Sequence, residues 1–208
     1  MKILTVSVVA LFIAASPAFA QSSRPQIEPR TKQAEPRAKP APRPNKPDRS
    51  RDLNFLFGAL KAAPDAEAAK SVEVRITSLL ANSGSDTTDL LMQRAKRALD
   101  AKDNDLSLQL LDAVVDIRPE FAEGWNRRAT LHFLNKNYVA AIADIRHVLA
   151  IEPRHFGAMV GFGMILHELD EDALALKVLR KALEVHPYLE RIDELVKTLS
   201  EKVEGREI

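Results

Sequence analysis

Apolar residues recur with helical spacing from about residue 52 to the end of the chain. Leu53, Leu56, Phe57 and Leu60 fall at i, i+3, i+4 and i+7, which is the spacing of one face of an α-helix. Between residues 88 and 187, stripes of this kind alternate with short polar turns, so the pattern predicts an all-α protein. Six helices are expected there, at about 87–101, 104–117, 121–135, 138–151, 155–169 and 172–185.

The pattern returns at a fixed interval of 34 residues. Each period ends on a proline, at Pro119, Pro153 and Pro187. Proline ends a helix because it lacks an amide donor and biases the preceding residue away from the helical region. The small residues that repeat in register are Ala95, Ala129 and Gly163 in the first helix of each period and Ser107, Ala141 and Ala175 in the second. A period of this length is typical of stacked helical hairpins, because one hairpin cannot bury its apolar face alone.

The second period carries the residues of a known repeat family. Trp125 stands early in its first helix, Ala129 follows four residues later, Ala141 lies in its second helix and Pro153 closes it. This arrangement resembles the tetratricopeptide repeat. The periods that match it in register are about 88–119, 122–153 and 156–187. The resemblance implies that residues 85–187 form a right-handed α-solenoid of three helical hairpins.

The segments on either side of the repeats are expected to close the ends of the stack. Residues 52–84 carry two apolar stripes separated by a turn at Pro64. Extending the 34-residue register backwards would place Pro64 inside a helix, so this segment is not a fourth repeat. We expect it to form an N-terminal helical hairpin that caps the open end. Residues 188–208 carry one apolar stripe on a polar background, which predicts a C-terminal capping helix.

The N-terminus has a different composition from the helical region. Lys2, an apolar run over 3–15 and the small-x-small sequence ending at Ala20 predict a signal peptide over 1–20, cleaved after Ala20. A permanent membrane anchor is the alternative, but the run falls short of the about 20 residues that span a bilayer. The chain has no cysteine, so a bacterial lipoprotein is not expected. We therefore expect an exported, periplasmic protein.

Residues 21–51 are rich in proline and basic residues. They hold nine lysines and arginines against three acidic residues, a formal charge of +6, whereas 52–208 carry −6. With almost no large apolar side chains, this segment is expected to be a disordered linker. It is either a spacer or a tether to an anionic envelope surface. Export makes a nucleic-acid partner unexpected.

The resemblance also implies a binding site. Tetratricopeptide stacks bind an extended peptide or a partner helix in a concave groove lined by the first helix of each repeat. The residues of this chain at groove positions are Met92, Lys96, Asn126, Arg127, Thr130, Phe133, Val160, Met164 and His167, together with Gln93 and Leu99. The apolar members suit an apolar side chain or helix face, with Lys96, Asn126 and Arg127 fixing its orientation. The alternative for the apolar members is that the next repeat covers them as core.

A clamp for a partner's carboxyl terminus is not expected in this groove. Such clamps use basic and asparagine side chains, and Met92, Lys96 and Val160 occupy much of that place here.

Motifs for catalysis or for a bound cofactor are not found. His132 stands at a core aromatic position of the repeat, and the chain has no His-x-x-x-His spacing, phosphate loop or nucleophile elbow. We therefore expect no cofactor, no metal and no enzymatic activity. The expected function is an exported adaptor that binds a protein partner in the groove during envelope protein assembly. The alternative is a protein held at the envelope surface by its basic arm, with the repeats used for self-association.

Overall fold

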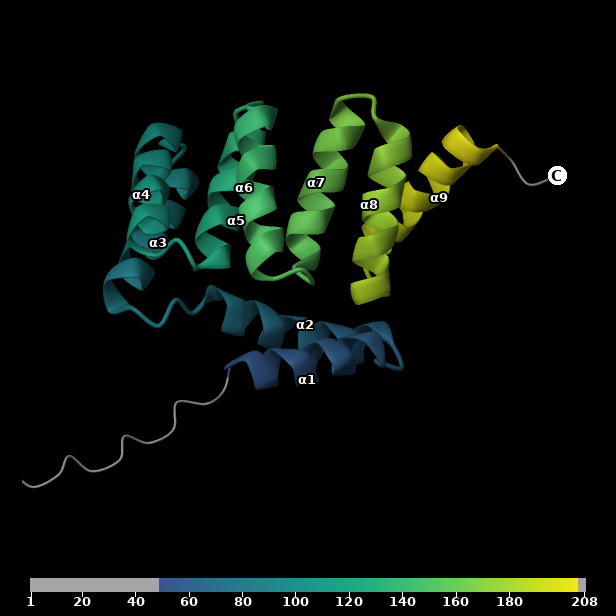
Figure 1. The fold of residues 1–208 in the computed structure, drawn as a ribbon, viewed down its shortest axis with the longest axis horizontal. Coiled ribbons are helices and arrows are strands. Elements are labelled where there is room, and N and C mark those ends of the chain that lie inside the picture. The colour runs from purple at the N-terminus through teal and green to yellow at the C-terminus, as the bar shows by residue number, and fades with distance from the viewer. Residues whose placement is uncertain (1–48, 206–208) are drawn as a thin grey trace, which may run out of the picture. The chain divides into compact units, whose positions relative to one another are not determined.

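A computed structural model describes residues 49–205, and within that range the chain forms helices and no strands (Figure 1). The predicted signal peptide and most of the predicted linker lie outside the described residues. The linker's last three residues, 49–51, belong to the first helix, so the boundary predicted at 51 is wrong by three residues. No described helix combines the length and the apolar character needed to cross a membrane.

Three antiparallel hairpins stack side by side, as the 34-residue period predicts (Figure 1). Their helices are α3 (Asp86–Asp100) and α4 (Asn104–Ile117), α5 (Ala122–Leu134) and α6 (Tyr138–Ile151), and α7 (Phe156–Glu168) and α8 (Asp172–Val185). The predicted capping helix is α9 (Glu190–Glu204), whose Leu199 is buried against Leu176 and Leu179 of the last hairpin. The all-α solenoid expected from the sequence is therefore confirmed.

The period extends to the backbone of the turn inside each hairpin. Lys102, Lys136 and Asp170 all have positive φ angles, of 61°, 58° and 59°. Each stands just before the N-terminal region of the second helix, and the Asp103 and Asn137 side chains cap that helix by accepting a backbone N–H. A left-handed residue costs about 1–2 kcal/mol, so the same turn recurs because the hairpin geometry demands it.

Small residues let the two helices of each hairpin approach closely. The Ser107 hydroxyl donates to the Ala95 carbonyl at 3.0 Å across the first hairpin. In the third hairpin, a Cβ atom built on Gly163 would lie 2.4 Å from Cδ2 of Leu179. Gly163 therefore leaves the space that the Leu179 side chain fills.

A charged contact joins the first two hairpins. Arg128 on α5 donates two hydrogen bonds to Asp144 on α6 and one to Asp112 on α4, each 2.8 Å long. Its guanidinium lies 4.8 Å from the ring of Trp125, which stacks on His147 at 4.2 Å between ring centroids. The hydrogen bonds to Asp144 raise the pKa of Arg128 despite its partial burial, so the guanidinium remains charged.

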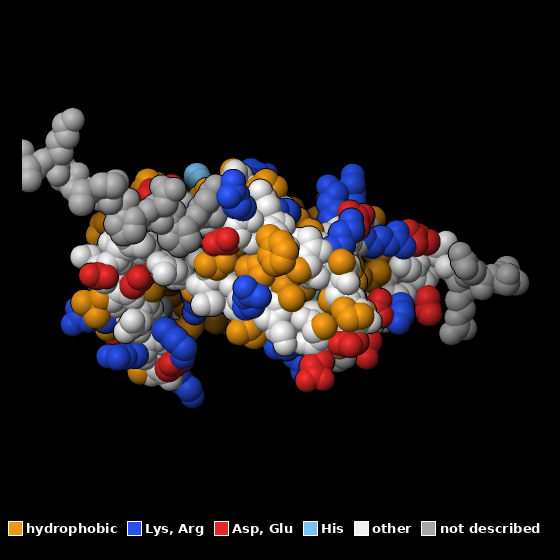
Figure 2. Space-filling model, turned by 90° about the horizontal axis from the view of Figure 1, so that it is seen from below, with side chains coloured by type: hydrophobic (Ala, Val, Ile, Leu, Met, Phe, Trp, Pro, Cys, Tyr) orange, Lys and Arg blue, Asp and Glu red, His pale blue; other side chains and the backbone are white. Residues whose placement is uncertain are grey.

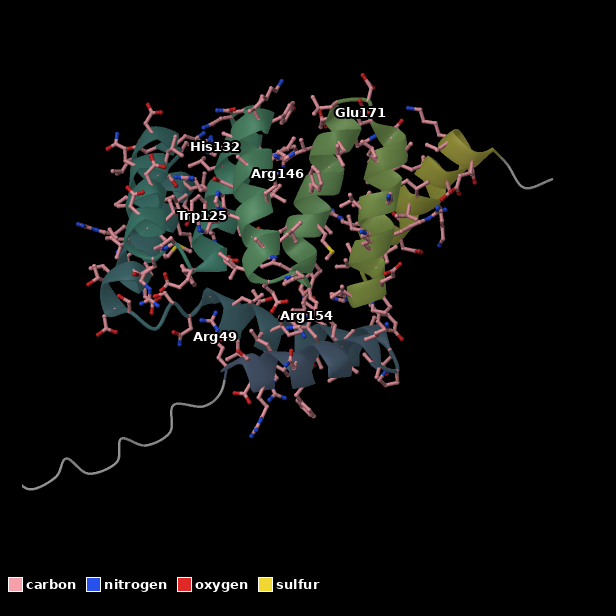
Figure 3. The ribbon with its side chains drawn as sticks, in the orientation of Figure 1. Arg49, Trp125, His132, Arg146, Arg154 and Glu171 are labelled. Carbon is pink, nitrogen blue, oxygen red and sulfur yellow. The ribbon has the colours of Figure 1, made fainter. Side chains whose placement is uncertain are left out.

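The N-terminal hairpin forms as predicted but lies elsewhere. Its helices, α1 (Arg49–Lys61) and α2 (Ala66–Ala81), run across the ends of α5 to α8, where successive repeats join (Figure 1). The Tyr188 hydroxyl donates to the Ala63 carbonyl at 3.1 Å, and Arg154 donates to Asn54 at 2.8 Å. Figure 3 shows Arg154 between the stack and the hairpin. The expectation that this hairpin covers the open end of the stack is therefore wrong.

The residues at equivalent repeat positions explain this placement. Leu131 and Ile165 are fully buried against the preceding hairpin, whereas the first hairpin has the exposed Arg97 at the same position. At the open end of the stack, the charged Arg97 thus faces water at the position where later repeats bury an apolar residue. The segments that follow Pro153 and Pro187 instead carry aromatic side chains, Phe156 and Tyr188, and these pack against the core of the α1–α2 hairpin.

A buried histidine lies at the junction between the hairpin and the stack. The ring of His186 meets Phe156 edge-on with centroids 5.1 Å apart, and its Nε2 is 3.5 Å from a carboxylate oxygen of Glu73 on α2. Burial lowers the pKa of His186, and Glu73 only partly opposes this. The hairpin therefore docks against a neutral imidazole at neutral pH.

Replacing Gly163 with alanine is expected to destabilise the protein, although alanine is the better helix former. The new Cβ would lie 2.4 Å from Cδ2 and 2.6 Å from Cγ of Leu179, which is fully buried. Overpacking costs about 1–3 kcal/mol, more than the ~0.5–1 kcal/mol that alanine gains over glycine in a helix. Urea unfolding measures the effect. The control is Gly161→Ala, whose Cβ would come no closer than 3.9 Å to Ile145; equal stability of both variants would contradict the argument.

Replacing Asp144 with alanine is expected to lower the free energy of unfolding by about 2–3 kcal/mol. The change leaves the largely buried guanidinium of Arg128 with only the half-exposed Asp112 as a partner. Asp116→Ala removes an exposed carboxylate from α4 and should stay within about 0.5 kcal/mol of the wild type. Similar losses in the two variants, measured by urea unfolding, would show that the bond between Arg128 and Asp144 does not stabilise the pairing of α5 with α6.

Candidate partner-binding groove

The first helices of the first two hairpins enclose a pocket of about 260 Å³. Its lining residues are Met92, Ala95, Lys96, Leu99, Ser107, Leu111, Glu123, Asn126, Arg127 and Thr130. The structure thus brings together five of the nine predicted groove residues, those from Met92 to Thr130, and Leu99 with them. Both α3 and α5 contribute, because residues 34 apart occupy equivalent positions on neighbouring hairpins.

The floor of the pocket is apolar and its rim is polar. Met92 and Leu99 pack against the buried cluster of Ala95, Leu111 and Leu131, so these two apolar residues are partly core, as the alternative interpretation proposed. At the rim, Lys96 pairs with Asp100 at 2.7 Å, with both side chains about 60% exposed. Exposed pairs of this kind contribute little, so a ligand can displace Asp100 at small cost.

A buried carboxylate organises the polar wall of the pocket. Glu123 accepts hydrogen bonds from Arg127 at 2.7 Å and from Asn126 at 3.0 Å. Nε2 of His155 lies 3.5 Å from the same carboxylate. Burial, which raises the pKa of Glu123, is outweighed by His155 and by the charge and hydrogen bond of Arg127, which lower it. Glu123 is therefore ionised, and Arg127 is not an isolated cation.

The remaining predicted residues lie outside this pocket. Phe133 packs against Tyr138 with ring centroids 5.9 Å apart, so the structure does not place it in the groove wall around the pocket. His167 is 2.6 Å from a carboxylate oxygen of Asp172 near the turn that follows α7. Val160 and Met164 are half-buried on α7, 34 residues after Asn126 and Thr130, so they continue the same face onto the third hairpin.

The groove face changes character at the third hairpin. The positions held by Glu123, Asn126, Arg127 and Thr130 on α5 are held on α7 by Gly157, Val160, Gly161 and Met164. Charged and hydrogen-bonding side chains are thus replaced by apolar ones and by glycine. A Cβ atom on Gly161 would meet only Ile145, at 3.9 Å, so this position has room for a β-carbon.

The second helix of the N-terminal hairpin adds a wall that the sequence did not predict. Ser78, Ala81 and Asn82 face α3 and α5 across a hollow of about 390 Å³, which shares Met92, Lys96 and Arg127 with the pocket described above. Residues 78–82 and 127 are far apart in sequence. Since the repeat pattern stops at residue 85, no signal could have placed them together.

The described residues give no positive indication of catalysis or of metal binding. No group of three or more His, Asp or Glu side chains in 49–205 is arranged to hold a metal ion. The histidines make structural contacts instead. His132, for example, is mostly buried with Nε2 3.9 Å from Asp144, and Figure 3 shows it within the stack near Trp125.

The chain resembles known repeat proteins in sequence and in fold, although no family model matches it. A TPR repeat-containing protein of Rhizobium etli is 42% identical over 153 residues, which cover 74% of this chain and 75% of that protein. Its name uses the usual abbreviation of the tetratricopeptide repeat.

Solved structures share the fold at lower identity. The first TPR of Spaghetti (RPAP3), bound to an HSP90 peptide, has a TM-score of 0.55 at 18% identity and covers 58% of this chain and 95% of its own. The TPR2B domain of yeast Sti1 has a TM-score of 0.53 at 20% identity, and the match covers 57% of this chain and 99% of that domain. MamA has a TM-score of 0.53 at 17% identity, and the match covers 76% of this chain and 81% of the MamA chain.

The sequence relative, the fold and the register of the small residues agree with one another. At 42% identity over three quarters of both chains, the similarity to the Rhizobium etli protein shows the family, while the solved structures show the fold. The chain therefore belongs to the tetratricopeptide-repeat proteins.

Proposed function

We propose that this protein is a non-enzymatic adaptor that holds a segment of a partner protein in the groove lined by α3, α5 and α7. Tetratricopeptide repeats are typical protein-interaction modules, and the Spaghetti and Sti1 domains were solved with an HSP90 peptide and in a complex with pHsp70. The single observation that carries the proposal is the pocket between α3 and α5. It has the apolar floor and polar rim of a site for one anchoring side chain.

The chemistry of the groove favours a partner segment with two kinds of surface. At the first two hairpins, Lys96, Asn126 and Thr130 offer hydrogen bonds around the apolar floor. At the third, Val160 and Met164 offer apolar contact, and methionine adapts readily to different shapes. Because Arg127 is already paired with Glu123, a lone carboxylate is a poor main anchor. An amphipathic helix or an extended segment with spaced apolar residues fits better.

The proposed place of action is the bacterial envelope, after export. The predicted signal peptide over 1–20 supports a periplasmic location. In that compartment, the adaptor would hold a segment of an envelope protein during its assembly.

The distribution of charge favours a second candidate function. Residues 21–51 carry a formal charge of +6, and the last three of them are the first residues of α1. A segment of this charge is attracted to anionic surfaces within about a Debye length, about 8 Å at physiological salt. The protein would then act by residing at the envelope surface, and the repeats would serve self-association.

Replacing Gly161 with glutamine is expected to weaken partner binding without destabilising the fold. A Cβ atom at this position would meet only Ile145, at 3.9 Å, so we expect the longer side chain to extend over the groove face of α7, and glutamine is a better helix former than glycine. The measurement is quantitative capture of periplasmic proteins by each variant. For each protein that the wild type captures, we expect the captured amount to fall about tenfold or more, because one well-packed contact is lost.

The matched control is Ala143→Gln, an exposed position on α6 outside the groove-lining helices, which should capture the same species as the wild type. Phe133 is unsuitable for this test because it packs against Tyr138. Undiminished capture by the Gly161→Gln variant would overturn the groove proposal.

Deleting residues 21–48 while keeping 1–20 separates the two candidate functions. The adaptor proposal expects the shortened protein to reach the periplasm and to capture the same partners as the full chain. Loss of envelope association at low salt, with release of the full chain as salt rises, would favour the basic arm instead. Cell fractionation at two salt concentrations, followed by quantification of the protein, gives the answer.

A further inference from the structure

The outer face of the α1–α2 hairpin is unusually apolar for a surface that the repeats do not cover. Phe55 is 70% exposed and Val74 is 57% exposed. Figure 2 looks onto this side of the molecule and shows apolar side chains gathered at its centre. We call this surface the hairpin face; its residues are Asp52, Phe55, Gly58, Ser71, Val74 and Arg75.

The neighbours of Phe55 leave room for a second molecule to approach closely. Gly58 and Ser71 are exposed and small, and nothing lies within 4 Å of a Cβ atom built on Gly58. Phe55 is the most exposed aromatic side chain of the described residues, and such side chains are the usual anchors of protein interfaces.

A hollow lies beside the exposed aromatic ring. It has a volume of about 460 Å³, runs between α1 and α2, and its apolar wall consists of Leu56, Val74 and Leu79. Phe55 forms one edge of it. A protruding ring and a cavity of suitable character therefore lie next to each other on one surface.

The charges at the edge of the hollow are of opposite sign. Asp52 comes from α1 and Arg75 from α2, and neither makes an ion pair or a side-chain hydrogen bond with another described residue. An interface between two identical chains related by a two-fold axis must be complementary to itself. The hairpin face meets this condition in two ways. The protruding Phe55 ring lies beside a hollow, and the carboxylate of Asp52 and the guanidinium of Arg75 lie on the same surface.

We propose that two copies of this protein pair through their hairpin faces about a two-fold axis. Phe55 of each copy enters the hollow of the other, and Asp52 of each faces Arg75 of the other. The contact does not rest on the proposed function of the groove, because it uses the side of the hairpin that faces away from the repeats. The pair would present two grooves, so it could bind a partner with two sites more tightly than one copy can.

Sedimentation equilibrium tests this proposal. The sample is the protein expressed from its full sequence and purified after any processing by the cell. A contact of this modest size should give a dissociation constant of about 1–100 µM. Phe55→Asp should weaken dimerisation by at least about tenfold. The matched control is Val139→Asp, since Val139 on α6 is 83% exposed and lies outside the hairpin face. It should dimerise like the wild type, and circular dichroism should show that both variants are folded.

A charge exchange tests the two-fold arrangement itself. Asp52→Arg and Arg75→Asp should each weaken dimerisation, and the double variant should recover at least part of the loss because the pair is restored with reversed sign. A wild type that remains monomeric at about 500 µM, well above the expected constant, would overturn the proposal. So would equal weakening by Phe55→Asp and Val139→Asp, or a double variant no better than the single ones.

Vesicles distinguish a membrane from a second copy as the occupant of this face. A monomeric wild type that binds vesicles of anionic phospholipid, with binding lost in Phe55→Asp, would assign the face to a lipid surface and overturn the pairing. Dimerisation in the absence of lipid, lost in the same variant, supports it.

Discussion

The close approach of two helices at a small residue is the contact on which the rest of this structure depends. Ser107 reaches the backbone of α3, and Gly163 leaves space for the Leu179 side chain, so the two helices of a hairpin can share one narrow core. A hairpin this thin still exposes one apolar side, which the next hairpin covers. The distance between successive first helices then sets the width of the groove. The pocket beside Met92 and Thr130 is therefore a consequence of packing inside the hairpins as much as of its own lining.

The N-terminal hairpin shows that a repeat stack has more than its two ends to cover. The first hairpin protects its own open side with a charged residue, Arg97, where later hairpins bury Leu131 and Ile165. Phe156, at the start of α7, and Tyr188, just after α8, instead present apolar surface on which the α1–α2 hairpin packs. In this position, α2 also becomes a wall of the groove. The position of the α1–α2 hairpin thus affects both the stability of the stack and the shape of the groove surface.

The candidate site shows which features of a binding groove the 34-residue register predicts and which it does not. The register places residues from neighbouring hairpins at equivalent positions, so it predicts Met92 and Asn126 on one face, where the structure has them. It does not say how deep each position lies. Phe133 turns to pack against Tyr138, and Glu123, which the sequence did not single out, becomes the buried carboxylate that holds Arg127. Such details depend on side-chain packing between helices, which a period of 34 residues does not encode.

By itself, the sequence determined the helices, their number within the repeats, their pairing and the family, because these follow from local periodicity and from residues that recur at equal spacing. Only the tertiary structure decided where the α1–α2 hairpin lies, which wall it adds to the groove, and which of its apolar residues remain exposed. The physical reason is that the hairpin falls outside the repeat. Its contacts with Tyr188 and Arg154 join segments about a hundred residues apart, and no periodic pattern specifies which surface such a segment will cover.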